Sequence, residues 1–352
     1  MSVAGELHEV QRPGARVERV LRPASWLGAL EALHEHPDAR PVSGGTDLVL
    51  ELARNPGPAV TLVDLSAVAG AHEIVEEDDE FVLGGGVTHN QIVGDRRFRD
   101  HALPLAQACL EIGSPQLRNR ATLAGNLATA SPANDSISAL MALGASVVLS
   151  RLVGDTEVHR EVPVVGFFRG FRETVCERDE LITALRVPKL APHERGIWVK
   201  VGLRKAQAIS VVHAGLVLDL HEGLVHRARL ALGSVAPIVT ENHVLPAALE
   251  GHLLTDERIA HAARAVAASI SPIDDGRATA DYRRAVTETV VARALTTLAD
   301  DRQAECWPNE PPLLGIRTPS GRARHHEVGD HTDIEVSVDG RTTVGRAAAR
   351  ST

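Results

Sequence analysis

The stretch from residue 113 to residue 144 constrains the fold of this chain more than any other. Its first part combines small residues with short hydroxyl and amide side chains, at Ala121, Thr122, Ala124, Gly125 and Asn126. Such a composition lets backbone N–H groups approach an anion closely. Apolar residues then recur at helical spacing and predict a helix whose positive end lies near the same loop; they are Ile137, Leu140, Met141 and Leu143. The stretch is typical of a phosphate-binding loop, although a Gly/Ala-rich turn between a strand and a helix fits the composition equally well.

A second glycine-rich stretch, at residues 41–50, favours the phosphate-binding interpretation over a simple turn. Gly44 and Gly45 stand between two short apolar runs and are followed by Thr46 and Asp47, which supply polar side chains. Two loops of this kind suit a diphosphate better than one loop does. We therefore expect a ligand that carries a diphosphate.

Together, the two loops resemble those of the FAD-binding subunit of the molybdenum hydroxylases, the family of xanthine dehydrogenase and carbon monoxide dehydrogenase. The first loop is similar to the family's Ala-Gly-Gly-Thr-Asp-Leu segment. Residues 117–126 and 130–135 follow the family's Ile-Arg-Asn-x-Ala-Thr-x-Gly-Gly-Asn and Ala-Ser-Pro-x-x-Asp patterns, with Leu117 in place of the isoleucine and Ala124 in place of one glycine. The resemblance extends in order over about residues 15–299.

This resemblance implies an α+β fold, with a two-part FAD-binding domain of the PCMH type followed by a C-terminal α+β domain made of a small sheet plus helices. We expect the FAD-binding domain, with two α/β subdomains, at residues 14–190. The C-terminal flavoprotein domain is expected at 191–299, since proline and polar residues interrupt the strand pattern near its start. Residues 1–13 are predicted to form a flexible N-terminus.

Residues 300–352 differ in composition from the rest and are predicted to be a largely disordered tail. Within this tail, residues 333–341 predict a short alternating strand with a turn. That strand resembles the opening of the family's iron–sulfur subunit, but the cysteines of that subunit are missing.

The resemblance also implies FAD as the cofactor and a set of residues that hold it. The glycines and polar residues of the two loops would bind the diphosphate, and Asp135 a polar part of the cofactor. Ile112 and Ile182 would lie against the flavin ring. The full expected set is Val42, Ser43, Gly44, Gly45, Thr46, Asp47, Leu48, Ile112, Thr122, Leu123, Ala124, Gly125, Asn126, Asp135, Ile182 and Lys200.

Lys200 matches the family's lysine that reaches the flavin. A lysine near the pyrimidine side of the ring would stabilise negative charge on reduced flavin. A surface lysine on a strand is the alternative interpretation. The sequence departs from the family nearby, because Ala208 and Ser210 stand where Asp and Ala are common.

Composition restricts the other function classes. A net charge of −9 and a pI of about 6.0 argue against nucleic-acid or anionic-membrane partners. No apolar run reaches the ~18–20 residues of a membrane span, so we expect a cytoplasmic protein. The three cysteines are widely separated and indicate neither a disulfide framework nor an iron–sulfur site. We expect no metal site and no catalytic side chain, since neither a Ser/His/Asp nor a Cys/His arrangement can be argued from spacing.

The leading functional hypothesis is an electron-transfer subunit. The resemblance implies a molybdenum-cofactor large subunit and an iron–sulfur small subunit as partners, with electrons passing through FAD to NAD or another acceptor. The alternative is a self-standing FAD-dependent enzyme that acts on a small molecule without such partners. A flavin-free binding module is a third hypothesis.

Overall fold

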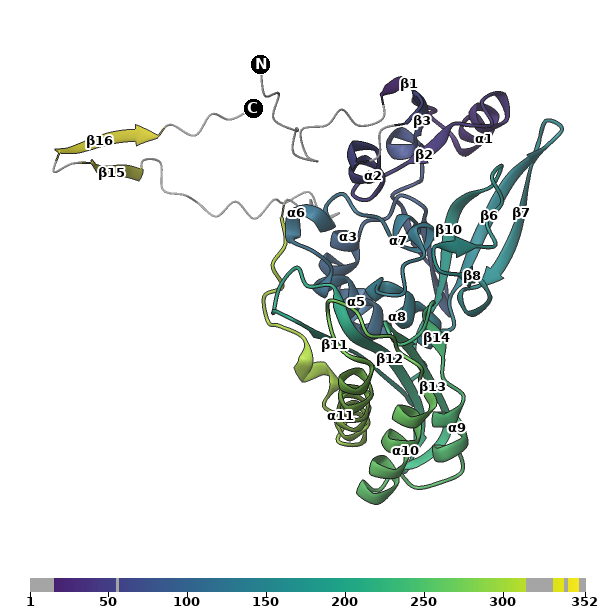
Figure 1. Ribbon diagram of the computed structural model, residues 1–352, viewed down its shortest axis with the longest axis vertical. Helices are drawn as coiled ribbons and strands as arrows, with labels where there is room; N and C mark the ends of the chain where they lie inside the picture. The colour runs from purple at the N-terminus through teal and green to yellow at the C-terminus, as the bar shows by residue number, and fades with distance from the viewer. Residues whose placement is uncertain (1–15, 55–56, 315–331, 339–340, 348–352) are drawn as a thin grey trace, which may run out of the picture. The chain divides into compact units, whose positions relative to one another are not determined.

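The computed structural model describes residues 16–54, 57–314, 332–338 and 341–347 (Figure 1). The flexible N-terminus predicted at 1–13, and residues 315–331, 339–340 and 348–352 of the tail predicted to be largely disordered, lie outside these residues. Clustering of contacts divides the chain into two compact units that meet between Leu314 and Gly315. The first unit contains both expected domains, and the second contains the end of the chain.

The first subdomain is a small parallel α/β unit. Its sheet has the strand order β1-β3-β2. Ser25 caps the first helix, because its side chain accepts a hydrogen bond from the Gly28 amide at 3.1 Å. The elements are β1 (Val17–Leu21), α1 (Trp26–Glu35), β2 (Arg40–Val42), α2 (Leu48–Arg54), β3 (Val60–Asp64) and the 3₁₀-helix η2 (Leu65–Ala67).

The second subdomain is built on an antiparallel sheet with the order β4-β5-β10-β6-β7. The strands are β4 (Ile74–Glu76), β5 (Glu80–Gly84), β6 (Ser146–Val153), β7 (Thr156–Pro163) and β10 (Leu181–Pro188), with the short pair β8 (Phe168–Gly170) and β9 (Glu173–Thr174) after the 3₁₀-helix η3 (Val164–Gly166). The helices are α3 (His89–Gly94), α4 (Arg96–His101), α5 (Leu103–Glu111), α6 (Pro115–Arg118), α7 (Leu123–Thr129) and α8 (Asp135–Leu143). The sequence did not predict α4, α6 and α7, because helices this short display too few turns for a periodic pattern.

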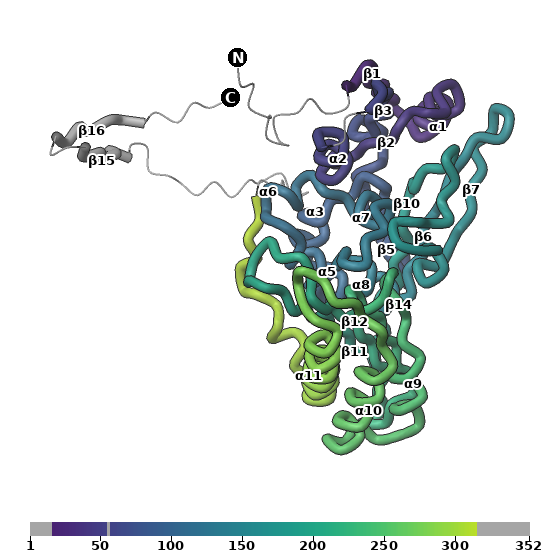
Figure 2. The backbone as a smooth tube through the Cα atoms, viewed as in Figure 1, coloured from purple at the N-terminus to yellow at the C-terminus, as the bar shows by residue number. Residues whose placement is uncertain are grey.

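The C-terminal domain is an antiparallel sheet, β11-β12-β13-β14, covered by helices on both faces (Figure 2). Side chains alternate between the faces along each strand. Trp198, Val217 and Ala231 belong to one core with α5 and α8, while their strand neighbours belong to another core with α10 and α11. The elements are β11 (Glu194–Gly202), β12 (Ser210–His221), β13 (Leu224–Gly233), β14 (Thr240–Glu241), α9 (Val244–Leu249), α10 (Asp256–Ser269), α11 (Ala280–Ala299) and the 3₁₀-helix η4 (Gln303–Cys306).

The chain beyond α11 returns to the second subdomain. Arg118 donates a hydrogen bond to the Pro312 carbonyl at 2.7 Å, and Asn119 donates to the Leu314 carbonyl at 2.9 Å. Asn90 donates to the same Leu314 carbonyl at 3.1 Å. The first part of the expected tail is thus attached to α3 and α6 by polar contacts.

In the second compact unit, β15 (Thr332–Val338) pairs with β16 (Arg341–Ala347) as an antiparallel hairpin. The short strand expected near residue 333 is therefore present, with a partner strand that the sequence did not predict.

The two domains of the first unit are in close backbone contact at Gly215, on β12. A Cβ at this position would overlap the Ser138 carbonyl and lie 3.0 Å from the Cα of Ala139, both on α8. Only glycine lets the helix backbone come this close to the strand.

We expect Gly215→Ala to lower the free energy of unfolding by about 1–3 kcal/mol, because the added methyl group must push α8 away from the sheet. Gly166→Ala is the matched control, since a Cβ there has no neighbour within 4 Å. Urea unfolding of both variants checks this, and equal stabilities would show that the contact at Gly215 carries no packing constraint.

Candidate functional site

The two predicted glycine loops are in direct contact. A Cβ at Gly44 would overlap the Arg120 carbonyl and lie 3.1 Å from the Cα of Ala121. Gly45 adopts a φ of +72°, in the left-handed region that glycine accepts without strain. The missing side chain of Gly44 therefore lets one loop pack against the other, while Gly45 allows the backbone to turn.

The second loop is the start of helix α7. Thr122 is its N-cap, and the Thr122 hydroxyl accepts a hydrogen bond from the Gly125 amide at 3.0 Å. Leu123 and Ala124 are buried, whereas Gly125 is exposed. A Cβ at Gly125 would meet only the Thr122 hydroxyl, at 2.9 Å. Gly125 thus leaves an open surface above the first turn of α7 that a side chain would fill.

Asn126 links this turn to the start of helix α8. Its side-chain oxygen accepts a hydrogen bond from the Ser136 hydroxyl at 2.6 Å, and its carbonyl accepts one from the Asn134 side chain at 2.7 Å. Asp135, the first residue of α8, lies between these two partners in the sequence.

Asp135 forms a buried ion pair with Lys200. Lys200 Nζ donates to Asp135 Oδ2 at 2.6 Å, and each side chain is 7 % exposed. The surface-lysine interpretation of Lys200 is therefore wrong. Ser210 donates to the other carboxylate oxygen, Oδ1, at 2.5 Å. The residue that departs from the family pattern thus takes part in holding Asp135.

A polar network continues behind Ser210. The Ser210 carbonyl accepts from the Ser234 hydroxyl at 3.0 Å, and the Ser234 carbonyl accepts from the buried Arg283 at 2.6 Å. Arg283 also pairs with Asp275 at 2.6 Å. Although the desolvation of Asp275 acts in the opposite direction, hydrogen bonds from Arg277 and Arg283 hold the pKa of this carboxyl below its ordinary value. The network fixes the backbone from which Ser210 reaches Asp135.

The two residues expected against the flavin ring are Ile182, on β10, and Ile112, at the C-terminal end of α5. Ile182 is buried in β10, and a Cβ at Gly85 would overlap the Ile182 carbonyl. The segment that contains Gly85 reaches the second loop, since the Leu123 amide donates to the Val87 carbonyl at 3.1 Å. The Ile112 carbonyl accepts a hydrogen bond from Arg118 at 3.3 Å. Ile182 is thus connected to the second loop through the Gly85 segment, and Ile112 to the short helix α6 before that loop.

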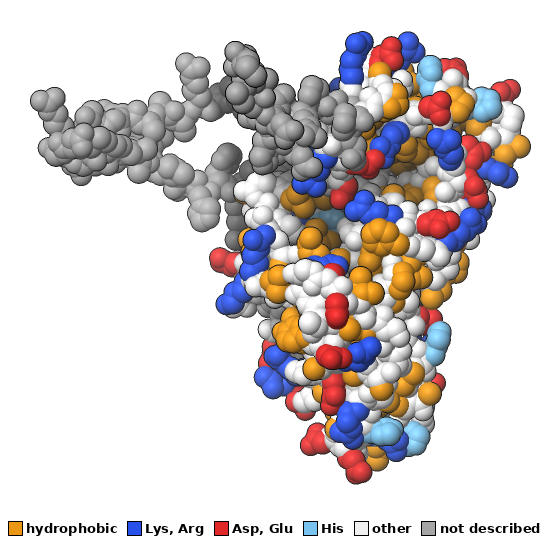
Figure 3. Space-filling view, in the orientation of Figure 1, with side chains coloured by type: hydrophobic (Ala, Val, Ile, Leu, Met, Phe, Trp, Pro, Cys, Tyr) orange, Lys and Arg blue, Asp and Glu red, His pale blue; other side chains and the backbone are white. Residues whose placement is uncertain are grey.

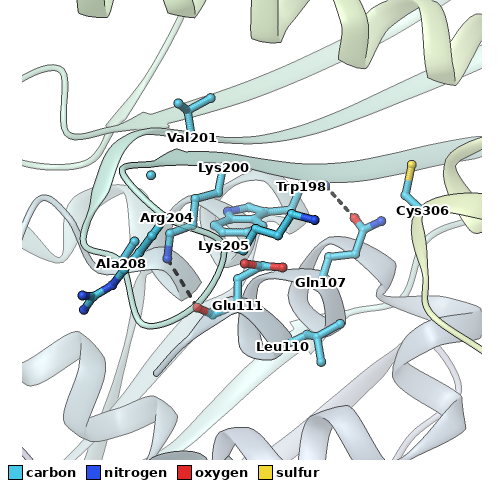
Figure 4. A pocket seen from close by; sticks show the side chains of 11 residues that line it. Gln107, Leu110, Glu111, Trp198, Lys200, Val201, Arg204, Lys205, Ala208 and Cys306 are labelled. Atoms are coloured by element: carbon cyan, nitrogen blue, oxygen red, sulfur yellow. Dashed lines mark hydrogen bonds between the residues drawn. The ribbon is translucent and has the colours of Figure 1, made fainter. Parts of the chain in front are cut away.

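A pocket of about 430 Å³ opens beside Lys200 (Figure 4). The Gln107 side chain accepts a hydrogen bond from the Trp198 amide at 2.7 Å, while its buried Nε2 has no hydrogen-bond partner among the described residues. Burial raises the pKa of the Glu111 carboxyl above its ordinary value. The lining residues are Gln107, Leu110, Glu111, Trp198, Lys200, Val201, Gly202, Arg204, Lys205, Ala208 and Cys306.

Sequence reasoning missed most of these pocket residues. Gln107 was the one available signal, because it is a polar residue within the largely apolar segment 103–110. Trp198 is anchored by a bond from its indole to the Ser138 hydroxyl at 2.9 Å, which in turn bonds His213 at 2.7 Å. Burial lowers the pKa of His213, which favours the neutral ring in this core position.

These features fit FAD. An exposed glycine at the first turn of α7 leaves room for a diphosphate, and Lys200 places a cation beside the pocket. The unpartnered Gln107 Nε2 is a buried donor that a polar ring atom would satisfy. Figure 3 shows a hollow in the surface beneath the N-terminal subdomain, with basic side chains at its rim.

Among the described residues, no helix has both the length and the apolar character that crossing a bilayer requires.

Family models cover most of the chain. The FAD-binding domain in molybdopterin dehydrogenase matches residues 15–190, and the CO dehydrogenase flavoprotein C-terminal domain matches residues 198–298. The chain is 30% identical over 258 residues to the carbon monoxide dehydrogenase medium chain of Hydrogenophaga pseudoflava, covering 73% of this chain and 88% of that one. It is 32% identical over 205 residues to the nicotinate dehydrogenase FAD-subunit of Eubacterium barkeri, covering 57% and 68%.

Solved structures agree with these matches. A chain of carbon monoxide dehydrogenase from Hydrogenophaga pseudoflava superposes with a TM-score of 0.77 at 29% identity, covering 83% of this chain and 100% of that one. A chain of quinoline 2-oxidoreductase from Pseudomonas putida 86 superposes with a TM-score of 0.76 at 25% identity, with the same coverage. The chain therefore belongs to the family of FAD-binding oxidoreductase subunits of the molybdenum hydroxylases, which includes the medium chains of carbon monoxide dehydrogenase and the FAD-binding subunits of xanthine dehydrogenase, and FAD is its cofactor.

Proposed function

We propose that this chain transfers electrons within a molybdenum hydroxylase complex in the cytoplasm, from the iron–sulfur clusters of a partner through FAD to NAD or another acceptor. One observation carries the proposal. A series of contacts runs from Gly44 through Ala121 and Thr122 to Asn126, and then across Ser136 and Asp135 to Lys200. This series joins the glycine loops to a buried cation, an arrangement that suits a dinucleotide with a redox-active ring.

In this proposal the residues of the two loops bind the diphosphate. Backbone N–H groups near Gly45 and Gly125 would face it, and Asn126 would hold the second loop against α8. FAD, when bound, supplies the one- and two-electron redox chemistry. The ion pair with Asp135 fixes the Lys200 ammonium. In this position Lys200 would lie beside the flavin ring, and its charge would favour the reduced, more negative cofactor.

The pocket beside Lys200 is where we propose that the electron acceptor approaches. Arg204 and Lys205 are exposed at its edge. Arginine and lysine bind phosphate groups well, so a nicotinamide dinucleotide suits this edge.

The proposed partners are a molybdenum-cofactor large subunit and an iron–sulfur small subunit. Relatives are named as the medium chain of carbon monoxide dehydrogenase and the medium subunit of nicotine 6-hydroxylase, and these names support a place in a multi-subunit enzyme.

Gly125→Val is expected to reduce FAD occupancy by at least tenfold, because the added side chain fills the open surface above α7. Ala128→Val is the control, since Ala128 is also exposed on α7 but lies one turn further along. Absorbance of the purified proteins measures the bound flavin. Full occupancy in Gly125→Val would mean that the diphosphate lies elsewhere.

Lys200→Gln is expected to lower the midpoint potential of the bound flavin by roughly 30–60 mV. A hydrogen bond to a charged group contributes ~1.5–3 kcal/mol, and about 30 mV corresponds to ~1.4 kcal/mol for a two-electron couple. Lys189→Gln is the control, because Lys189 pairs with Glu76 in the acidic hairpin instead. Redox titration of both variants measures this potential. An unchanged potential in Lys200→Gln would show that Lys200 does not interact with the flavin ring.

Isolation of the tagged chain from its native host tests the partners. We expect a large and a small subunit to co-purify with molybdenum, iron and FAD, as detected by mass spectrometry, metal analysis and absorbance. A yellow protein that is isolated alone, without either metal, would contradict the complex and favour a self-standing flavoenzyme.

A further inference from the structure

Two histidines and an aspartate meet at one end of the C-terminal sheet. His193 lies just before β11, and Asp219 and His221 lie near the end of β12. Asp219 and His221 are two residues apart on a strand, so their side chains share one face of the sheet. The Leu220 amide donates to the His193 carbonyl at 3.0 Å, which brings His193 beside them.

The three side chains present their ligand atoms to one another. His221 Nε2 lies 2.9 Å from Asp219 Oδ1, and His193 Nε2 lies 3.6 Å from Asp219 Oδ2. One ligand atom from each residue falls within a group that spans no more than 4.8 Å. The imidazoles are 49 % and 44 % exposed, so the group is open to solvent on one side.

Asp219 Oδ1 lacks a hydrogen-bond partner among the described residues. This oxygen is buried, yet among the described residues it has no hydrogen-bond donor, because its close contact with His221 lacks hydrogen-bond geometry. A buried oxygen without a partner is costly. The nearby Arg229 pairs with Glu194 at 2.8 Å.

We propose that His193, Asp219 and His221 bind a divalent transition-metal ion, with zinc as the best match. Imidazole nitrogens and a carboxylate oxygen are typical zinc ligands, with bonds of about 2.0–2.2 Å that place tetrahedral ligand atoms ~3.3–3.5 Å apart. The histidine–aspartate separations of 2.9 and 3.6 Å lie on either side of this spacing but involve different carboxylate oxygens. Binding therefore requires rotation of the Asp219 carboxylate and of the two imidazoles. Water or His226, whose ring lies 4.5 Å from that of His221, takes the fourth position.

This site is independent of the flavin site. Seven residues of extended chain separate His193 from Lys200, which is roughly 20 Å along the strand. The ion would connect the segment before β11 to the end of β12 and would stabilise this end of the sheet. The sequence predicted no metal, because the ligands come from two chain segments and follow no recognised ligand spacing.

The test is titration of the full chain with Co²⁺ and then Zn²⁺, comparing wild type with Asp219→Asn, His221→Gln and the control His261→Gln. His261 is exposed on α10. We expect wild type and the control to show the visible bands of tetrahedral Co²⁺ without a thiolate charge-transfer band, and these bands to disappear when zinc is added.

Both site variants should lose these bands, and their zinc affinity should fall by at least the roughly 10–100-fold that loss of a supporting partner alone costs. Circular dichroism and flavin content show whether the variants remain folded. Absence of such a band in wild type, or equal binding by all four proteins, would overturn the proposal. Neither result depends on whether the flavin transfers electrons to NAD, so the two proposals can fail separately.

Discussion

The ion pair between Asp135 and Lys200 is the interaction on which the candidate site depends. Each partner comes from a different domain, Asp135 from the start of α8 and Lys200 from β11. A buried charge left without its partner is strongly destabilising, at about 3–5 kcal/mol. The pair therefore couples the position of the C-terminal sheet to that of the glycine loops, and Ser210 and the network behind it hold the carboxylate in one orientation.

Close packing of α8 on the C-terminal sheet brings Asp135 and Lys200 together. The sheet has helices on both faces, so β12 is apolar almost continuously, and Gly215 lets the backbone of α8 lie against it. A strand of this kind buries both of its faces, unlike a strand with one solvated face. The same packing buries Trp198 and His213 and forms the floor of the pocket beside Lys200.

The periodic elements could be predicted closely from the sequence. Short apolar runs mark the strands at 17–21 and 60–64, and the hydroxyl residues Ser25 and Thr88 cap helices, as this residue type often does. Short elements could not be predicted, and α7 is the important case, because a segment that reads as a glycine loop is the first turn of a helix. The close contact of Gly44 with the Arg120 backbone could not be predicted from the motif, because it joins two loops that are far apart in the chain.

The sequence by itself determined the family, the cofactor and the two loops, because these depend on small residues and local motifs that can be read in order. Only the tertiary structure decided that Lys200 is buried against Asp135, that Ser210 joins them, and that Gln107 faces a pocket with an unpartnered donor. It also brought His193 to Asp219 and His221. These contacts join residues far apart in the chain, and burial and distance are set by packing, which no local pattern encodes.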